Sequence, residues 1–150
     1  MNDYVTKIDF TATDRKIYYI LTNDIAEWWT EMFEGTSNEP GQAFTVRFGP
    51  TVYKTMLIEE LVPDKKIVWR VVDSLIDIPE LKSKTERINT LIVWEILAQR
   101  DKTVLSLTHL GLTPQIECYT ICEKGWQNFI NSLSDYINTG VGKPFKIDKN

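Results

Sequence analysis

Alternation of apolar and polar residues along the chain predicts six β-strands. In the segment YVTKIDF near the start, Thr6, Ile8 and Phe10 share one face, while Lys7 and Asp9 share the other. Such a strand has one buried side and one side in water, as in many antiparallel sheets. Five further segments are predicted strands on the same grounds: AFTVRF, TVYKTMLIEEL, KIVWRVVD, TLIVWEIL and TVLSLTHLGL.

The charged residues of each strand indicate which side chains point inward. In TVYKTMLIEEL, Lys54 and Glu60 mark an outer face, so Tyr53, Thr55 and Leu57 are expected to point inward. The same reasoning gives the other strands an inward set rich in aromatic residues: Phe44, Val46, Phe48, Trp69, Val71, Thr90, Ile92, Trp94, Ile96, Leu105, Leu107 and His109. The strands therefore predict a strongly apolar sheet face that another element must cover.

Two short helices are predicted between the first and second strands. Thr13 is an N-cap candidate for the first helix, and Asn23 and Asp24 interrupt it. The segment DIAEWWTEMF predicts the second, in which Trp28 and Trp29 lie about 100° apart. We expect Trp29 to point inward, whereas Trp28 either belongs to a hydrophobic plug or faces a cavity mouth or a partner.

The segment EKGWQNFINSLSDYI predicts a long C-terminal helix that Gly140 and Pro144 end. Gly125 is expected to let this helix approach the sheet closely, at a cost of about 1 kcal/mol relative to Ala. The helix is the only predicted element long enough to cover the sheet. Its apolar side holds Cys118, Cys122, Gly125, Trp126, Phe129, Leu133, Tyr136 and Ile137.

The order of these elements predicts an α+β protein with a single domain over residues 1–150. A curved antiparallel sheet of about six strands would wrap around the C-terminal helix, with two short helices after the first strand. The space between sheet and helix is either a solid core or a cavity. A solid core is the simpler interpretation for each aromatic residue alone, whereas the whole set is also typical of a ligand pocket.

Composition excludes several classes of function. A net charge of −4 with 17 scattered basic residues does not suit a nucleic-acid partner. No stretch approaches the roughly 20 apolar residues of a membrane helix, and the start lacks the regions of a signal peptide, so a cytoplasmic location is expected. Cys118 and Cys122 are four residues apart and are expected to be reduced thiols.

His109, the single histidine, is a weak candidate for a catalytic acid or base. Without a defined carboxylate partner, such a histidine is more often a hydrogen-bonded structural residue. Together with Cys118 and Cys122 it lacks the ligand number and paired spacings of a zinc site, so neither a metal nor a cofactor is expected. A Cys–His nucleophilic pair has no third, orienting residue. No phosphate loop, paired carboxylate set or Ser-His-Asp order is present.

Long segments of the chain resemble a known superfamily. IAEWWTEMFEG, GQAFTVRFGPTVYKTMLIEELVPDKKIVWRVVDS and LTHLGLTPQIECYTICEKGWQNFINSLSDYINTGVGKP are similar to START-like (SRPBCC) proteins. The bacterial branch named for similarity to activators of the heat-shock-protein-90 ATPase is the most similar. The resemblance implies a helix-grip (Bet v-like) fold with a cavity between sheet and helix, which in many members binds a hydrophobic small molecule. Members usually carry Glu-Trp where this chain has Glu86-Arg87, so a more polar cavity mouth is expected.

Pattern and resemblance together suggest three functions. The first is binding of a hydrophobic or amphipathic small molecule by a cavity lined with Trp29, Phe44, Phe48, Tyr53, Trp69, Trp94, His109, Cys122, Trp126 and Phe129. The second is a co-chaperone-like role with a chaperone partner, for which Trp28 or Met32 would be exposed contacts. The third, ranked below binding, is a lyase or cyclase that uses His109 in the same cavity. The exposed sheet edge also allows a homodimer.

Overall fold

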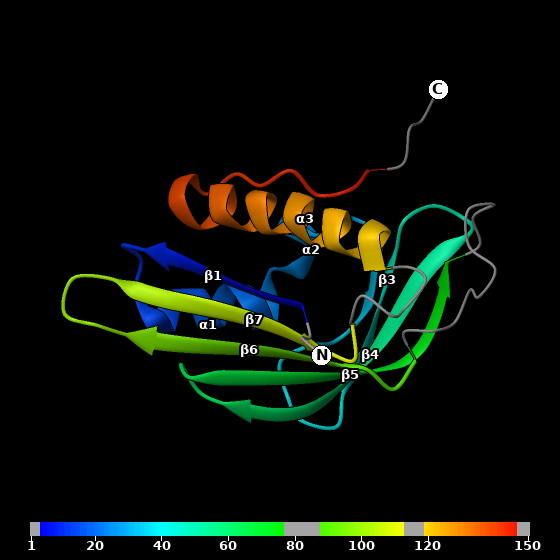
Figure 1. Cartoon of the computed structure of the whole chain (residues 1–150), viewed down its shortest axis with the longest axis horizontal. Helices are drawn as coiled ribbons and strands as arrows, with labels where there is room; N and C mark the ends of the chain where they lie inside the picture. Colours follow the sequence, from blue (N-terminus) through cyan, green and yellow to red (C-terminus); the bar gives the residue numbers. More distant parts are fainter. Residues whose placement is uncertain (1–3, 77–87, 113–118, 147–150) are drawn as a thin grey trace.

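Seven antiparallel strands form one curved sheet, and a long helix crosses its inner face (Figure 1). The computed structural model describes residues 4–76, 88–112 and 119–146. The strands are β1 (Tyr4–Phe10), β2 (Phe33–Gly35), β3 (Ala43–Arg47), β4 (Val52–Val62), β5 (Lys66–Ile76), β6 (Leu91–Ala98) and β7 (Thr103–Leu110). The helices are α1 (Asp14–Asn23), α2 (Ile25–Trp28) and α3 (Tyr119–Thr139). The strand order is β1-β7-β6-β5-β4-β3-β2, which makes β1 and β2 the two edges.

The predicted α+β helix-grip architecture is confirmed, with one strand more than expected. The additional strand, β2, pairs antiparallel with β3. Its three residues are too few for an alternating pattern to be recognised. Gly35 has a φ of +99°, and a Cβ there would lie 2.5 Å from the carbonyl oxygen of Ala43, so this close pairing requires glycine.

Burial confirms the predicted inward face of most strands. In β1, Phe10 is buried, whereas Lys7 and Asp9 are exposed. In β3, Phe44 and Val46 are buried as expected. The buried residues of β5, β6 and β7 include every one that was predicted to point inward: Trp69, Val71, Ile92, Trp94, Ile96, Leu105, Leu107 and His109.

The predicted inward face of β4 is wrong. Lys54, Met56 and Ile58 are buried, while Tyr53 and Leu57 are half-buried on the opposite face. Both faces of this strand carry apolar residues, so the charge of Lys54 is the main guide in the sequence. Lys54 is nevertheless buried in the folded chain, so its charge indicates the wrong face of the strand.

The two short helices differ in how far they follow the prediction. α1 begins as expected, because the hydroxyl of Thr13 accepts a hydrogen bond from the backbone N–H of Lys16 at 3.1 Å. α2 is a single turn that ends at Trp28, much shorter than the predicted helix. Trp29 follows it as the C-cap, so the separation of 100° expected within a helix does not apply.

Trp28 and Trp29 are both fully buried, and their rings stack at a centroid distance of 5.5 Å. The expectation that Trp29 points inward is confirmed. Trp28 belongs to the hydrophobic plug, and its alternative role as an exposed contact is wrong. Met32 is half-buried.

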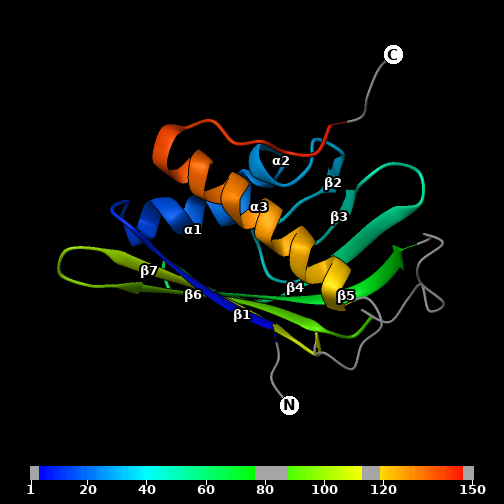
Figure 2. The ribbon, with the colours of Figure 1, turned by 45° about the horizontal axis from the view of Figure 1, so that its top comes forward.

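α3 covers the inner face of the sheet, as Figure 2 shows. Its buried apolar residues are Trp126, Ile130, Leu133 and Ile137. Burial of each aliphatic side chain contributes about 1.5–3 kcal/mol. The helix ends at Gly140, as predicted: this residue has a φ of +82° and donates its N–H to the carbonyl of Tyr136. In the described ranges, no helix is long and apolar enough to cross a membrane.

After α3 the chain runs back beside α2 (Figure 2). The N–H of Phe145 donates to the carbonyl of Trp29 at 2.9 Å, and the carbonyl of Phe145 accepts from Glu31 at 3.0 Å. A Cβ on Gly142 would lie 2.5 Å from the carbonyl oxygen of Glu27, so the segment passes α2 at backbone distance. This segment after α3 thereby holds Trp29 in place.

Candidate functional site

Four tryptophan side chains beneath α3 form a closed ring of contacts. Ring centroids lie 6.0 Å apart for Trp29 and Trp69, 5.8 Å for Trp69 and Trp94, 6.0 Å for Trp94 and Trp126, and 5.2 Å for Trp126 and Trp29. All four are buried, and we call them the tryptophan cluster. Aromatic pairs of this kind contribute about 0.5–1.5 kcal/mol each beyond area burial.

Phenylalanines predicted to line the same space pack around this cluster. The ring of Phe44 meets Trp69 edge-on at 5.0 Å. Phe48 and Phe129 are half-buried, lie 5.3 Å apart, and both contact Trp29. The fold thus brings together aromatic residues from β3, β5, β6 and α3 that are far apart in the sequence. Among the described residues, these side chains contact one another directly.

Tyr53 lies outside this interior, contrary to the expected cavity lining. Its hydroxyl donates to Asp73 at 3.3 Å on the exposed face of the sheet. The guanidinium of Arg47 lies 5.3 Å from the centroid of its ring on the same face. Successive strand residues point to opposite faces, so the inward position of Lys54 turns Tyr53 outward.

Lys54 carries an amino group into the interior. Its exposed fraction is 7%, and its Nζ lies 5.3 Å from the ring centroid of Trp29 and 5.1 Å from that of Trp126. Attraction between an ammonium and an indole face is about 2 kcal/mol where water is excluded. Lysine side chains are seldom buried to this extent, so Lys54 adds a polar group that is unusual for an aromatic interior.

His109 is fully buried and bonded through both ring nitrogens. The indole Nε1–H of Trp126 donates to Nδ1 of His109 at 3.0 Å. Because indole can only donate, Nδ1 carries a lone pair, and the neutral ring has its proton on Nε2. Nε2 lies 2.8 Å from the hydroxyl oxygen of Thr90, which then accepts the hydrogen bond. This geometry favours the structural interpretation of His109 over an acid–base role.

Four buried donors in the described part of the chain have no hydrogen-bond partner. They are the indole N–H groups of Trp28, Trp69 and Trp94 and the hydroxyl of Ser74. Each unsatisfied buried polar group costs about 1–3 kcal/mol. The interior between sheet and α3 therefore has donor capacity that the described side chains leave unused.

Four residues named in the sequence analysis lie outside the described part of the structure. They are Glu86, Arg87 and Cys118, together with the side chain of Cys122. Gly125 does not mark a close approach to the sheet: in the described structure, nothing lies within 4 Å of a Cβ placed there. Among the described residues, no group of three His, Cys, Asp or Glu side chains could hold a metal ion.

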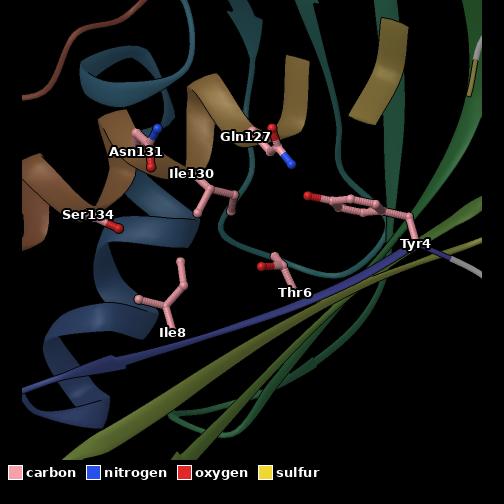
Figure 3. A pocket seen from close by; sticks show the side chains of 7 residues that line it. All are labelled: Tyr4, Thr6, Ile8, Gln127, Ile130, Asn131 and Ser134. Atoms are coloured by element: carbon pink, nitrogen blue, oxygen red, sulfur yellow. The ribbon is translucent and has the colours of Figure 1, made fainter. Parts of the chain in front are cut away.

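A groove of about 330 Å³ separates α3 from the edge strand β1. Figure 3 shows Thr6 and Ile8 pointing into it from β1, with Ile130 and Gln127 of α3 on the other side. Tyr4, Asn131 and Ser134 complete the lining. The groove is lined by hydroxyl and amide groups as well as aliphatic side chains, unlike the aromatic interior.

A second groove, of about 350 Å³, lies against α1. Tyr18 lines it together with Asp64 of the turn between β4 and β5. Burial raises the pKa of the Tyr18 phenol, and the negative charge of Asp64 raises it further. This hydroxyl is therefore held in its neutral form.

The sequence model of the family described as "Activator of Hsp90 ATPase homolog 1-like protein" matches residues 11–138. The chain belongs to this family. The match covers most of the chain and confirms the resemblance noted in its sequence. A comparison with curated proteins found no match.

Solved structures of other proteins share the fold of this family member. The Aha1 dimer from Colwellia psychrerythraea is 23% identical with a TM-score of 0.74, over 95% of this chain and 100% of that one. DynU16, a putative protein in the dynemicin biosynthetic locus, is 15% identical with a TM-score of 0.74, over 95% of this chain and 49% of its own. SSP2350 from Staphylococcus saprophyticus is 15% identical with a TM-score of 0.69, over 96% of this chain and 99% of that one.

Sequence reasoning missed two polar residues of this family member's interior. The sequence predicts Lys54 outward, because both faces of β4 carry apolar residues and leave its charge as the main guide. Ser74 follows Asp73 near the end of β5, just beyond the predicted strand KIVWRVVD, yet it is 1% exposed. Both side chains add polar atoms to a space that the sequence predicts as aromatic.

Proposed function

We propose that the chain binds an amphipathic small molecule between the inner face of the sheet and α3. The observation that carries the proposal is the set of unpartnered donors in an aromatic interior: the indole N–H groups of Trp28, Trp69 and Trp94 and the hydroxyl of Ser74. Acceptor oxygens of an otherwise apolar molecule would accept hydrogen bonds from these donors. Pockets for small ligands combine apolar walls with a few polar groups in this way.

Lys54 supports an acidic polar end on that molecule. Its ammonium lies over Trp29 and Trp126, and a carboxylate or phosphate oxygen would form a charge-assisted hydrogen bond with it. The aromatic rings would contact the apolar body of the ligand. The proposed wall residues are Trp29, Phe44, Phe48, Trp69, Trp94, Cys122, Trp126 and Phe129, with His109 fixing the orientation of Trp126.

Relatives give independent support. The family's members share this fold, and the proposal extends to this chain the ligand-binding role common among START-like proteins. We place this activity in the cytoplasm, where the two cysteines of the chain would stay reduced. A small-molecule carrier needs no catalytic group, and the two bonded nitrogens of His109 fit that role better than a lyase or cyclase.

A matched series of ligands tests this function. A long-chain fatty acid, the alcohol of equal length and the alkane are titrated against the protein, with tryptophan fluorescence and native mass spectrometry as readouts. We expect saturable one-to-one binding in the order acid, alcohol, alkane. Absence of saturable binding across the series, with no small molecule co-purifying, would overturn the proposal.

Two variants separate the polar end from the walls. Lys54→Met keeps a side chain of similar length and should remove the preference for the acid over the alcohol. Trp126→Ala should weaken all three ligands, because it opens the wall beside Trp29. Lys143→Met is the control, since its side chain is 84% exposed and its amino group lies beside Asp135 at the surface. Wild-type affinity in both Lys54→Met and Trp126→Ala would contradict the site.

A second candidate function is interaction with a chaperone of the heat-shock-protein-90 class. The family description supports it, and apolar side chains on the outer sheet face offer a contact surface: Val72, Leu97 and Leu110 are 39%, 58% and 38% exposed. A direct binding measurement with a purified bacterial homologue of that chaperone tests it. Binding that Leu97→Glu weakens would support this role, and no binding would end it.

A further inference from the structure

In the described part of the structure, the outer edge of β1 pairs with no other strand. β1 has seven residues and pairs with β7 on one side; among the described strands, none lies on the other side. The opposite edge, β2, has three residues, which is the usual way of blunting a sheet edge. An open strand of seven residues is a template for another strand.

Nothing in the described helices closes over this edge. The groove of about 330 Å³ lies between β1 and α3 and keeps the helix away from the strand (Figure 3). Ile8 points into the groove and is only half-buried, so apolar surface remains at the middle of the strand. Space and apolar contact are therefore both available to a strand added beside β1.

The charges of β1 select the partner. Lys7 and Asp9 are exposed on the outer face, two residues apart and opposite in sign. In antiparallel pairing of two identical strands about a two-fold axis at Ile8, Lys7 of each strand lies opposite Asp9 of the other. Moving the axis to Lys7 would oppose two lysines, and moving it to Asp9 would oppose two aspartates. Opposite charges directly across an antiparallel pair stabilise it, and like charges destabilise it.

We propose that two copies of this chain dimerise through antiparallel β1–β1 pairing, with the two-fold axis at Ile8. The sheets of both copies then form one continuous sheet. Residues 6–10 of each strand are paired, the two Ile8 side chains meet where the two grooves adjoin, and Lys7 of one copy joins an existing ion pair between Asp9 and Lys102 of the other. This interface does not depend on a ligand in the interior.

Charge exchange tests the partner. In sedimentation equilibrium, Lys7→Glu and Asp9→Lys should each weaken dimerisation by at least about tenfold, because symmetry makes two pairs repulsive at once. The double variant Lys7→Glu, Asp9→Lys should restore the dimer. Lys102→Gln removes only the ion pair within one copy and should leave the dimer formed. A wild-type monomer at the highest concentration reached, or a dimer unaffected by the single exchanges, would overturn the proposal.

A cysteine scan tests the register. Directly opposed residues in antiparallel strands have Cα atoms about 4.5–5.5 Å apart, within the range that a disulfide spans. Under mild copper–phenanthroline oxidation, Ile8→Cys should cross-link two chains much faster than Lys7→Cys or Asp9→Cys. The parent chain, with Cys118 and Cys122, gives the background rate. Faster linking at position 7 or 9, or no linking above the parent, would overturn the assignment. Because neither assay involves a ligand, its failure leaves the proposed function standing.

Discussion

The indole N–H of Trp126 donates a hydrogen bond to Nδ1 of His109 at 3.0 Å, and both side chains are buried. The bond joins α3 to β7, residues 17 positions apart in the sequence, and fixes the orientation of both rings. One face of the same indole lies against the amino group of Lys54, and its ring meets Trp29 and Trp94. Trp126 is thus the residue through which the helix is held to the polar part of the interior.

The first prediction concerns the tautomer of His109. Since Trp126 can only donate, the neutral imidazole should carry its proton on Nε2 and donate to Thr90. His109 is the single histidine, so long-range ¹H–¹⁵N spectra at pH 8 report it without ambiguity. Observation of the Nδ1–H tautomer would contradict the arrangement. In Trp126→Phe the constraint is lost, and a mixture of tautomers is expected.

The second prediction compares two tryptophans. Trp126→Phe should lower the free energy of unfolding more than Trp94→Phe, by about 1–3 kcal/mol, because only the first leaves a buried acceptor without its donor. The indole N–H of Trp94 has no partner, so its removal costs packing alone. Urea unfolding followed by far-ultraviolet circular dichroism measures both. Equal losses would show that the hydrogen bond contributes nothing net.

The third prediction concerns Tyr136 at high pH. Burial raises its pKa from 10.0 to about 12, and the hydrogen bond from its hydroxyl to Asp24 at 3.0 Å, together with the charge of that carboxylate, adds to the shift. The unfolded chain therefore loses this proton before the folded chain does. The stabilisation is complete below pH 10 and is lost as the pH rises from 10 to about 12.

Urea unfolding at several pH values from 8 to 12 checks this sign. Tyr136→Phe should be less stable than the wild type below pH 10, and the difference should shrink toward pH 12. Asp24→Asn keeps an acceptor for the hydroxyl but removes the charge, so the pKa of Tyr136 in the folded chain should be raised less. The decline should still begin near pH 10, but it should be smaller and end at a lower pH. A difference between wild type and Tyr136→Phe that stays constant across this range would contradict the shifted pKa.

The fourth prediction compares two glycines. Gly142→Ala should be destabilising by about 1–3 kcal/mol, because a Cβ there would lie 2.5 Å from the backbone oxygen of Glu27. Gly125→Ala should be neutral or stabilising by up to about 1 kcal/mol, since the helical position has open space around it. Thermal unfolding of both variants provides the check. A large loss in Gly125→Ala would restore the close approach that the sequence suggests.

The sequence by itself determined the order of elements, the inner faces of most strands and the covering role of α3. Local periodicity carries that information, because a buried face repeats every two residues in a strand and every 3.6 in a helix. It also identified the residues of the tryptophan cluster. The family resemblance in the sequence led to the same fold, and the family match over residues 11–138 agrees with it.

The tertiary structure alone decided that Lys54 and Ser74 lie inside, and which partners the buried polar groups have. Indoles from the loop after α2 and from α3 meet the amino group of buried Lys54, and no local pattern encodes contacts between residues so far apart. Tyr53 turns outward as a consequence, and His109 gains its partner only when α3 packs on β7. The three-residue β2 exists because β3 offers an edge to it. Local periodicity records burial, whereas the pairing of specific polar atoms depends on how distant segments meet.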